Sequence, residues 1–578
     1  MTQYVALSWA EDASPPPQAI GWLRRTLAEE PGWRIVLDEP TLLVAVSARH
    51  PLAVRHLKPS GVIIGDLFAR NGGDAGSWAE DAGLRGGGHD AVCRTLADRY
   101  WGRYVAIQRG GPATSIFRDP MGALECVTWR ASGVEVVAST LPGWLTAGLP
   151  PRLALNWSVV ASHLAHPTNV SGPLALDGVH AVTPGVMRTS REEGAAEVTV
   201  WSPAGIVRTR EPDLEPGRLV EVLDTCVRAL VRDRTVLAEV SGGLDSAIVA
   251  TALARAPDVR VAQWLNYHLG DAEGDERPFA RAVARRAGVT LTEAVKPGFA
   301  IDDRALSEVA HGPRPAVWAT DGAYDRDVAR RCVDVGAEAL LTGKGGDTVF
   351  FQMATALVAA DHLRARGVPG LFDPVIPDVA RWTRRSVWAV LRASLLASAP
   401  FAGASRGTAA TARHPWLRDI ADLPPGKRLH IRSLASCLTF SGDCRRAQAA
   451  HLIHPILAQP VVEHCLALST VVLTQGRRDR AFARRAFADR LPPEVSSRWG
   501  KGDATAFFGR ALAEHRDFLR AHLLDGRLVA AGLLNRRRLE QALQEDSLIW
   551  RGGFGSIIHA VAVESWVRAW ERRLWRLG

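Results

Sequence analysis

Two short glycine-rich segments contain residue types that can hold a nucleotide phosphate. The first consists of Val240, Ser241, Gly242, Gly243, Leu244, Asp245 and Ser246. It lies between an apolar, strand-like run and a helix-like run from Ala247 to Ala256. Adjacent glycines let backbone N–H groups approach an anion without interference from a Cβ atom, and the following helix directs its positive end to the same place. The pattern predicts a phosphate-binding loop.

Asp245 adds a carboxylate to this loop, which would repel a phosphate unless a cation lay between them. Mg²⁺ is the natural candidate, because proteins hold it with one or two carboxylates together with phosphate oxygens. The segment lacks the lysine and the spacing of a GxxxxGK[ST] loop, so it is not a P-loop of that type. The alternative is a glycine turn before an ordinary buried helix.

A second segment has the same organisation further along the chain. It consists of Thr342, Gly343, Lys344, Gly345, Gly346, Asp347 and Thr348. It follows a short strand-like run and precedes an apolar run. Asp347 and Asp245 would share one Mg²⁺–pyrophosphate group if both loops lay at the same edge of a sheet. The alternative of a plain glycine turn stays open for this segment.

The chain divides near residue 205 into two parts with different patterns. Strand-like runs cover 4–8, 33–37, 41–46, 104–108, 115–117 and 134–138 in the first part. In the second part, the runs 236–240, 259–266, 290–295 and 338–342 alternate with helix-like segments. Such alternation implies a parallel sheet with helices on both faces, and ligands of these sheets bind at the carboxyl ends of the strands. Both glycine segments fall there.

The composition is that of a globular protein with more than one domain. Its 578 residues are too many for a single core. The formal net charge of +9 would favour anionic partners, but five lysines among 70 basic residues indicate a genome-wide preference for arginine. We therefore expect no nucleic-acid partner.

Cysteine usage and the apolar runs bear on the compartment. The seven cysteines are scattered and form no CxxC pair, which disfavours zinc and a disulfide framework and favours a reducing cytoplasm. No signal peptide is apparent, and no uncharged apolar run is long enough to span a membrane. The apolar segment 386–399 is interrupted by Arg392, and we expect a buried helix there rather than a membrane anchor.

Both glycine segments resemble those of a known superfamily. The first resembles the SGGxDS loop of the ATP-pyrophosphatase (PP-loop) enzymes, which cleave ATP between its α and β phosphates. The second resembles the SGxGxDE segment of asparagine synthetase and its relatives, with Thr348 in place of the usual Glu. Lys344 stands where asparagine synthetase has Glu and β-lactam synthetase has Tyr. Lys501 matches a lysine that contacts the ATP phosphates in these relatives; a surface lysine is the alternative.

The N-terminal part resembles the class II glutamine amidotransferase-like domain of the same relatives, an Ntn-hydrolase-like α+β fold. The resemblance lies in the order of segments 100–106, 117–120, 138–139 and 183–185. Glutamine-dependent members use an N-terminal cysteine as nucleophile, whereas position 2 is Thr2 and the first cysteine is Cys93. We expect a degenerate domain over 1–205 without glutaminase activity, and a doubly wound parallel-sheet synthetase domain over 206–578.

The segments 459–463, 476–481, 491–493 and 498–502 together resemble the cyclases of lasso-peptide biosynthesis. This resemblance implies that ATP adenylates an Asp or Glu side chain of a core peptide. The freed N-terminal amine then closes an isopeptide ring, with release of AMP and pyrophosphate. Implied partners are a precursor peptide, a leader-recognition protein and a leader protease, and the implied cofactors are ATP and Mg²⁺.

The same resemblance implies roles for single residues. Asp245 and Asp347 would hold Mg²⁺, and Lys501 would stabilise the transition state. ATP and pyrophosphate would contact Val240, Ser241, Gly242, Gly243, Leu244, Ser246, Thr342, Gly343, Gly345 and Gly346. Because an α-amine has a pKa of roughly 8, the loss of the Glu or Tyr at position 344 is tolerable. Our hypothesis is that Lys344 neutralises charge near the adenylate.

Three other functions stay open at this stage. The first is an asparagine or β-lactam synthetase-type enzyme that acts on a small molecule. The second is an ATP-pyrophosphatase that acts on tRNA, although no basic and aromatic RNA-binding module stands out. The third is a catalytically inactive protein that recruits the precursor peptide, against which the presence of Asp245, Asp347 and Lys501 argues.

Overall fold

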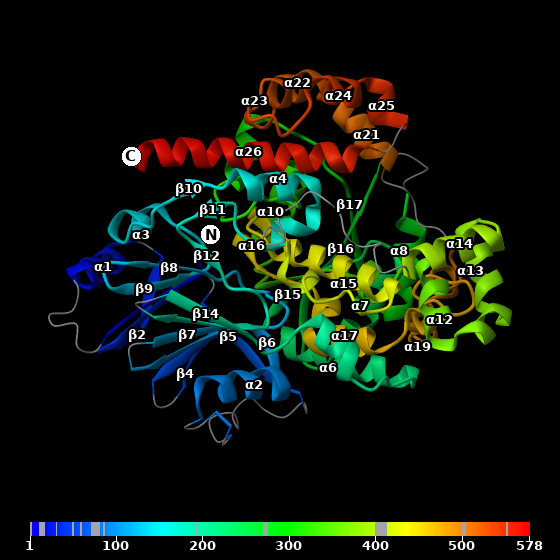
Figure 1. Ribbon diagram of the computed structural model, residues 1–578, viewed down its shortest axis with the longest axis horizontal. Coiled ribbons are helices and arrows are strands. Elements are labelled where there is room, and N and C mark those ends of the chain that lie inside the picture. Colours follow the sequence, from blue (N-terminus) through cyan, green and yellow to red (C-terminus); the bar gives the residue numbers. More distant parts are fainter. Residues whose placement is uncertain are drawn as a thin grey trace.

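Three sheets form the framework of the protein (Figure 1). The computed structural model describes residues 3–10, 18–30, 32–48, 51–57, 60–70, 81, 83–84, 87–111, 113–191, 194–269, 275–398, 413–499, 505–550 and 553–577. Lys501 therefore lies outside the described residues, as do Thr2 and most of the glycine-rich segment after Arg70.

The N-terminal part contains two six-stranded antiparallel sheets. The first has the order β12 (His180–Ala181), β8 (Val127–Ala131), β9 (Val134–Ala138), β1 (Tyr4–Trp9), β3 (Leu42–Ser47) and β2 (Trp33–Glu39). The second has the order β14 (Gly194–Thr199), β13 (Val186–Arg191), β7 (Ala113–Arg118), β6 (Tyr100–Gly110), β5 (Gly61–Ala69) and β4 (Val54–Leu57). A short pair, β10 (Ala154–Leu155) and β11 (Leu176–Asp177), accompanies them.

The two antiparallel sheets pack face to face, with helices outside. Side chains alternate across a strand, so Tyr4 of β1 faces the other sheet while Val5 faces the helices. The helices α1 (Gln18–Glu29), α3 (Gly143–Gly148) and α4 (Trp157–Ala165) cover the first sheet, and α2 (His89–Arg99) covers the second. The spacing of Ile20, Leu23 and Leu27 gives α1 the apolar face that it buries.

The C-terminal part is built on a five-stranded parallel sheet. Its order is β17 (Leu291–Val295), β16 (Arg260–His268), β15 (Thr235–Glu239), β18 (Ala339–Leu341) and β19 (His451–Ile453). Val236 and Ala238 face α6 (Pro216–Val231), α7 (Leu244–Ala254) and α8 (Arg277–Ala287). Leu237 points to the opposite face, towards α10 (Gly322–Asp334). The sheet is therefore covered on both faces, as its apolar strands require.

Further helices complete the chain. From residue 203 to residue 467 they are α5 (Pro203–Thr209), α9 (Asp303–Val309), α11 (Gly346–Val349), α12 (Leu357–Arg366), α13 (Val375–Thr383), α14 (Val387–Ser398), α15 (Pro425–Cys437), α16 (Arg445–Ala449) and α17 (Gln459–Ala467). After them come α18 (Thr470–Leu473), α19 (Ala481–Ala486), α20 (Pro493–Ser496), α21 (Thr505–Glu514), α22 (Arg516–Leu524), α23 (Arg527–Ala530), α24 (Arg536–Ala542), α25 (Glu545–Trp550) and α26 (Phe554–Leu577).

The last helix, α26, ties the C-terminus to the N-terminal part. Figure 1 shows it as a long red helix that runs past α4 towards β10. It buries Val563, Trp566, Val567 and Trp570, which recur at the spacing of one helix face. These side chains join the apolar cluster on the outside of the first sheet. Among the helices that the structure describes, none combines the length and the apolar character needed to cross a membrane.

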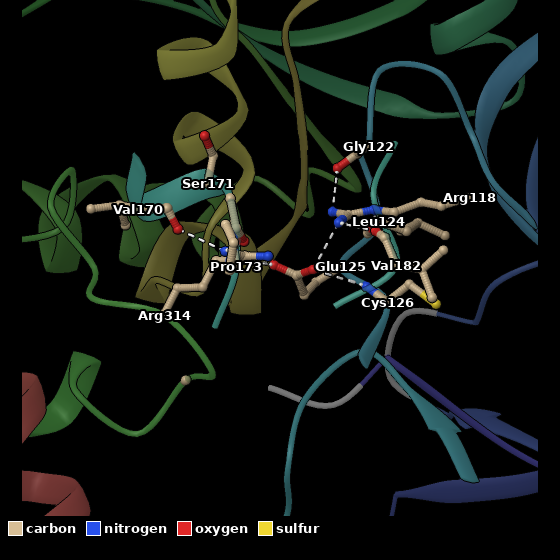
Figure 2. A network of polar contacts seen from close by, with 12 residues as sticks. Arg118, Gly122, Leu124, Glu125, Cys126, Val170, Ser171, Pro173, Val182 and Arg314 are labelled. Atoms are coloured by element: carbon tan, nitrogen blue, oxygen red, sulfur yellow. Dashed lines mark hydrogen bonds and ion pairs between the residues drawn. The ribbon is translucent and has the colours of Figure 1, made fainter. Parts of the chain in front are cut away.

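A buried ionic network also joins the two parts (Figure 2). Glu125 accepts hydrogen bonds from Arg118 at 2.8 Å and from Arg314 at 2.6 Å. Arg314 comes from the C-terminal part and also donates to the carbonyl oxygens of Val170 and Gly172. Burial alone would raise the pKa of Glu125, but the two guanidinium groups lower that pKa to about 2.

The predicted fold class is confirmed, with an antiparallel α+β part followed by a parallel-sheet α/β part. One local prediction is wrong. The helix expected to be buried near residues 386–399 forms as α14, but it lies at the edge of the molecule, with Trp388 80% exposed (Figure 1). An apolar composition does not show which face of a helix is buried. Helix α14 packs one face against α12 and leaves the face with Trp388 exposed.

Candidate active site

The two glycine loops lie side by side because the strands before them are neighbours. In β15 and β18, Ala238 pairs with Leu341 in a parallel register. The chain leaves β15 towards β16 on one side and later reaches β18 on the other side. This change of direction opens a crevice at the carboxyl ends of the two strands, which is where open α/β sheets bind ligands.

Close contact between the loops explains two of the glycines. A Cβ atom on Gly343 would lie 2.5 Å from the backbone nitrogen of Ser246. A Cβ atom on Gly346 would lie 2.3 Å from Cγ of Asp245. Any larger residue at either position would push the loops apart. These glycines are therefore needed for the close contact between the two loops, and not only for the turns.

The first loop is held in shape by its two serines. The hydroxyl groups of Ser241 and Ser246 lie 2.9 Å apart, and the backbone N–H of Ser241 donates to Oγ of Ser246 at 3.2 Å. Gly242 adopts a φ of 78°, a left-handed conformation that favours glycine. Helix α7 begins directly after this turn, at Leu244, and the N–H groups of a first helical turn have no acceptor within the helix.

Arg480 joins the two predicted metal-binding aspartates. Its Nη1 donates to Oδ2 of Asp245 at 2.9 Å and to Oδ1 of Asp347 at 2.7 Å. Its Nη2 lies 2.6 Å from the carboxylate of Asp479. Burial alone would lower the pKa of Arg480, but the three aspartates raise it above the usual value. The guanidinium therefore remains charged and balances the carboxylates.

The carboxylates of Asp245 and Asp347 fit a divalent cation. Oxygens from both already converge on a single cationic nitrogen of Arg480. Among the described residues no group of three or more His, Cys, Asp or Glu side chains gathers here that could hold a metal alone. Mg²⁺ at this place would need further oxygen ligands, and phosphate groups supply them in nucleotide sites.

A cavity of about 580 Å³ surrounds these groups. Its polar lining comes from both loops together with Asp479, Arg480, Arg484 and Arg498. Four aromatic side chains, namely Trp318, Trp382, Phe440 and Trp499, also line it, and the ring centres of Trp318 and Phe440 lie 4.7 Å apart. Arg498 is fixed by two hydrogen bonds to Glu276, at 2.5 and 2.7 Å, and lies over the ring of Phe279.

Lys344, in the second loop, lies against two of these aromatic side chains. Its Nζ lies 5.8 Å from the ring centre of Trp318 and 5.5 Å from that of Phe440, within the range of cation–π attraction. In the described part of the chain it makes no ion pair. Burial, followed by the nearby Arg446, lowers the pKa of Lys344 to about 8. Near neutral pH the side chain is a cation that loses its proton easily.

The predicted site residues are thus brought together, except for Lys501, which lies outside the described residues. Val240 is buried beneath the loop, and its carbonyl accepts a hydrogen bond from Asn266 at 2.7 Å. The sequence prediction named none of the aromatic side chains as site residues. Trp318, Trp382 and Phe440 come from segments far apart in the chain, so no spacing pattern links them to the loops.

Comparison with solved structures gives distant likenesses. A structure titled as the allosteric regulatory enzyme of purine biosynthesis is 12% identical, covers 59% of this chain and 89% of its own, and has a TM-score of 0.22. Glutamine phosphoribosylpyrophosphate amidotransferase from B. subtilis, complexed with ADP and GMP, is 11% identical, with 59% and 90% covered and a TM-score of 0.21. No curated protein matches the chain.

The match to a protein family is extensive. The family model of asparagine synthase matches residues 218–578, which is more than half of the chain and includes both glycine loops, Lys344 and Arg480. This match supports ATP-dependent formation of an amide bond. The chain belongs to the asparagine synthase family.

Proposed function

We propose that this protein closes the macrolactam ring of a lasso peptide. In the first step, the side-chain carboxylate of an Asp or Glu in a core peptide attacks the α-phosphorus of ATP, and pyrophosphate leaves. In the second step, the peptide's N-terminal amine attacks the acyl carbon, AMP leaves with the bonding electrons, and the amine loses a proton. The products are an isopeptide ring, AMP and pyrophosphate.

The observation that carries this proposal is the set of aromatic side chains that line the cavity together with the two loops. Trp318, Trp382, Phe440 and Trp499 offer large apolar surfaces, which suit peptide side chains better than the small, polar substrates aspartate or ammonia. Trp318 and Trp499 are also 51% and 70% exposed, so they extend this surface out of the cavity. Segments 459–502 add the sequence resemblance to lasso-peptide cyclases.

The two glycine loops would hold the triphosphate. Backbone N–H groups between Ser241 and Ser246, with the N-terminus of α7, would bind the departing pyrophosphate. Asp245 and Asp347 would hold Mg²⁺, which supplies charge neutralisation for the phosphates when bound. Arg480 lies between these two carboxylates and would contact phosphate oxygens once they turn to the metal.

Lys344 would act on the acyl half of the reaction. Its ammonium group lies against aromatic faces and forms no ion pair with the residues that the structure describes, so it can attract the substrate carboxylate and then the charge of the adenylate. Lys501 would stabilise the charge that develops as pyrophosphate leaves, as its place in the sequence suggests. A leader-recognition protein and a leader protease would deliver the core peptide with a free N-terminus.

ATP–pyrophosphate exchange by the purified chain tests the proposal. The assay compares a synthetic peptide that has one side-chain carboxylate and a free N-terminus, the same peptide with an acetylated N-terminus, and free aspartate. We expect exchange with both peptides, because adenylation needs only the carboxylate. We expect a product lighter by one water only with the free N-terminus.

Matched variants separate the site from general effects on the fold. Asp245→Ala should abolish exchange, whereas Asp334→Ala, an exposed aspartate on α10 with a long 3.8 Å contact to Arg330, should retain it. Exchange with aspartate alone would favour a small-molecule synthetase instead. Stimulation by tRNA, or no exchange with any carboxylate while ATP still binds, would contradict the proposal.

A further inference from the structure

Helix α14 presents an apolar face that nothing in the described structure covers. Trp388, Leu395 and Leu396 are 80%, 69% and 61% exposed, and they recur at the spacing of one helix face. The opposite face is already in use, because Val390 is fully buried and Ser394 donates a hydrogen bond to the carbonyl of Ala356 at 3.2 Å. Continuous exposed apolar surface of this kind marks a binding site more often than chance.

Exposed arginines lie on α14 and on the turn and helix end directly before it. Arg381, Arg384, Arg385 and Arg392 are exposed and form no ion pair or side-chain hydrogen bond with the residues that the structure describes. Between residues 379 and 398 the sequence contains no Asp or Glu. Most buried or half-buried arginines near the cavity are instead paired, as Arg480 and Arg498 are. The α14 face therefore combines apolar anchors with uncompensated positive charge.

This face and the cavity belong to consecutive helices. Trp382, on the preceding helix α13, lines the cavity, and a short turn that contains Arg384 and Arg385 leads from it to α14. Figure 1 shows α13 and α14 next to each other at the edge of the molecule, away from the antiparallel sheets. A polypeptide bound on α14 would therefore lie beside the helix that contributes Trp382 to the cavity.

We propose that the outer face of α14 binds an acidic, apolar segment of the substrate polypeptide that lies outside the reacting residues. This inference rests on the proposed function, since it takes the occupant of the cavity to be a peptide. Leucine-like side chains would pack on Trp388, Leu395 and Leu396, and carboxylates would pair with the four arginines.

Two other occupants fit the observations less well. A symmetric dimer through this face would bring the arginines of one copy against the same arginines of the other, which is repulsive. An anionic lipid surface would satisfy both the apolar anchors and the charge. The proposed substrate is itself a polypeptide, and the helix before α14 contributes Trp382 to the cavity that would hold its reacting end, so a polypeptide accounts for the position of this face and a lipid does not.

The test uses fluorescence anisotropy of the full chain without ATP. The first probe is a fluorescein-labelled peptide of alternating leucine and glutamate pairs, and the second has lysine in place of glutamate. We expect the glutamate peptide to bind at least about tenfold more tightly than the lysine peptide, because rim charges select partners. Raising NaCl from about 50 mM to about 500 mM should weaken this binding, because salt screens exposed charges.

Three variants locate the binding. The triple variant Trp388→Ser, Leu395→Ser, Leu396→Ser should lose at least about tenfold in affinity, as loss of central anchors does. The charge-reversal variant Arg384→Glu, Arg385→Glu, Arg392→Glu should instead prefer the lysine peptide. Trp575→Ser is the matched control, because Trp575 is 84% exposed next to Arg576 at the end of α26, which lies on the opposite side of Figure 1 from α14, and this variant should bind like the wild type.

Each remaining outcome overturns the inference. Binding unchanged in both α14 variants would place the site elsewhere. Binding of the wild type to phosphatidylglycerol vesicles but not to the glutamate peptide would assign the face to a membrane. Self-association that only the triple-serine variant loses would assign it to a second copy of the chain. The charge-reversal variant is expected to gain a preference for the lysine peptide. The inference therefore stays testable even if the triple-serine variant does not fold.

A second measurement ties the face to the substrate. The leucine–glutamate segment is attached to the acetylated test peptide, and ATP–pyrophosphate exchange is measured with and without it. The attached segment should lower KM at unchanged kcat in the wild type and in Trp575→Ser but not in the triple-serine variant. An unchanged KM in the wild type would overturn the substrate assignment. No exchange with any peptide would defeat the proposed function while leaving the binding preference intact.

Discussion

Arg480 donates one hydrogen bond to Asp245 at 2.9 Å from the same nitrogen that contacts Asp347. The guanidinium thus occupies the place between the two carboxylates where Mg²⁺ is expected. We predict that Arg480→Met lowers the free energy of unfolding by about 1–3 kcal/mol, because three aspartates lose their hydrogen bonds to this guanidinium. The same variant should bind Mg²⁺ more tightly without nucleotide, because the competing cation is gone.

Urea unfolding and calorimetric titration with Mg²⁺ measure the two effects. Arg485→Met is the matched control, since Arg485 is an exposed neighbour on the same helix whose guanidinium lies over the ring of Phe482. Equal Mg²⁺ affinities in the two variants would show that Arg480 does not compete for the metal site.

The ionisation of Lys344 predicts a pH dependence of adenylation. Burial and then Arg446 lower its pKa to about 8, against a smaller opposing effect of Glu239, Cys444 and Asp325. Lys344 is therefore charged below about pH 8 and neutral above it, so attraction of the substrate carboxylate should fade as the pH rises through that value. The exchange rate with the acetylated peptide, which has no titrating α-amine, should fall between about pH 7 and 9.

Substitutions at Lys344 test this assignment. Lys344→Arg should remove the decline, because a guanidinium stays charged over this range. Lys344→Ala should be slow and independent of pH. A flat wild-type profile, or a Lys344→Ala variant with unchanged adenylation and ring closure, would exclude a role of the ammonium group.

The two loops could be predicted from the sequence because their chemistry is local. Each loop follows a strand and precedes a helix, and the carboxyl ends of parallel strands gather their loops at one edge. The position of Arg480 was harder to predict from the sequence. The structure places it before α19, where a positive φ of 53° turns the chain towards both aspartates.

Features that depend on distant segments escaped the sequence analysis. Trp318, Trp382 and Phe440 meet at the cavity only through the tertiary fold. The segment 386–399 was expected to be buried because it is apolar, but composition does not state which face finds a partner. In the N-terminal part the helix α1 was overlooked, although Ile20, Leu23 and Leu27 have helical spacing.

Glu125 should carry much of the stability of the contact between the two parts. Replacing it by Gln leaves Arg118 and Arg314 largely buried without their counter-charge, which should cost about 3–5 kcal/mol of unfolding free energy. Because the folded pKa of Glu125 is about 2, below the usual 4.5, the wild type should lose this contribution as the pH falls from about 4.5 to about 2.

Urea unfolding at a series of pH values measures this loss. Glu197→Gln is the control. Glu197, on the edge strand β14, forms an ion pair with Arg188, and exposed ion pairs of this kind contribute about 0–1 kcal/mol to the free energy of unfolding. An equal effect of the two substitutions, or a Glu125→Gln variant that keeps the full acid sensitivity of the wild type, would show that the network in Figure 2 does not hold the parts together.

Gly346 is the residue at which a single methyl group should separate the two loops. A Cβ atom there would lie 2.3 Å from Cγ of Asp245, and the clash involves a side chain that is itself held by Arg480. Gly346→Ala should therefore displace Asp245 and reduce ATP–pyrophosphate exchange by about 100-fold or more, the scale on which misplaced catalytic groups act. Gly217→Ala is the control, because its Cβ would lie 3.6 Å from the nearest side-chain atom, at the start of α6. Exchange at the wild-type rate in Gly346→Ala would mean that the carboxylate of Asp245 is not needed where the structure places it.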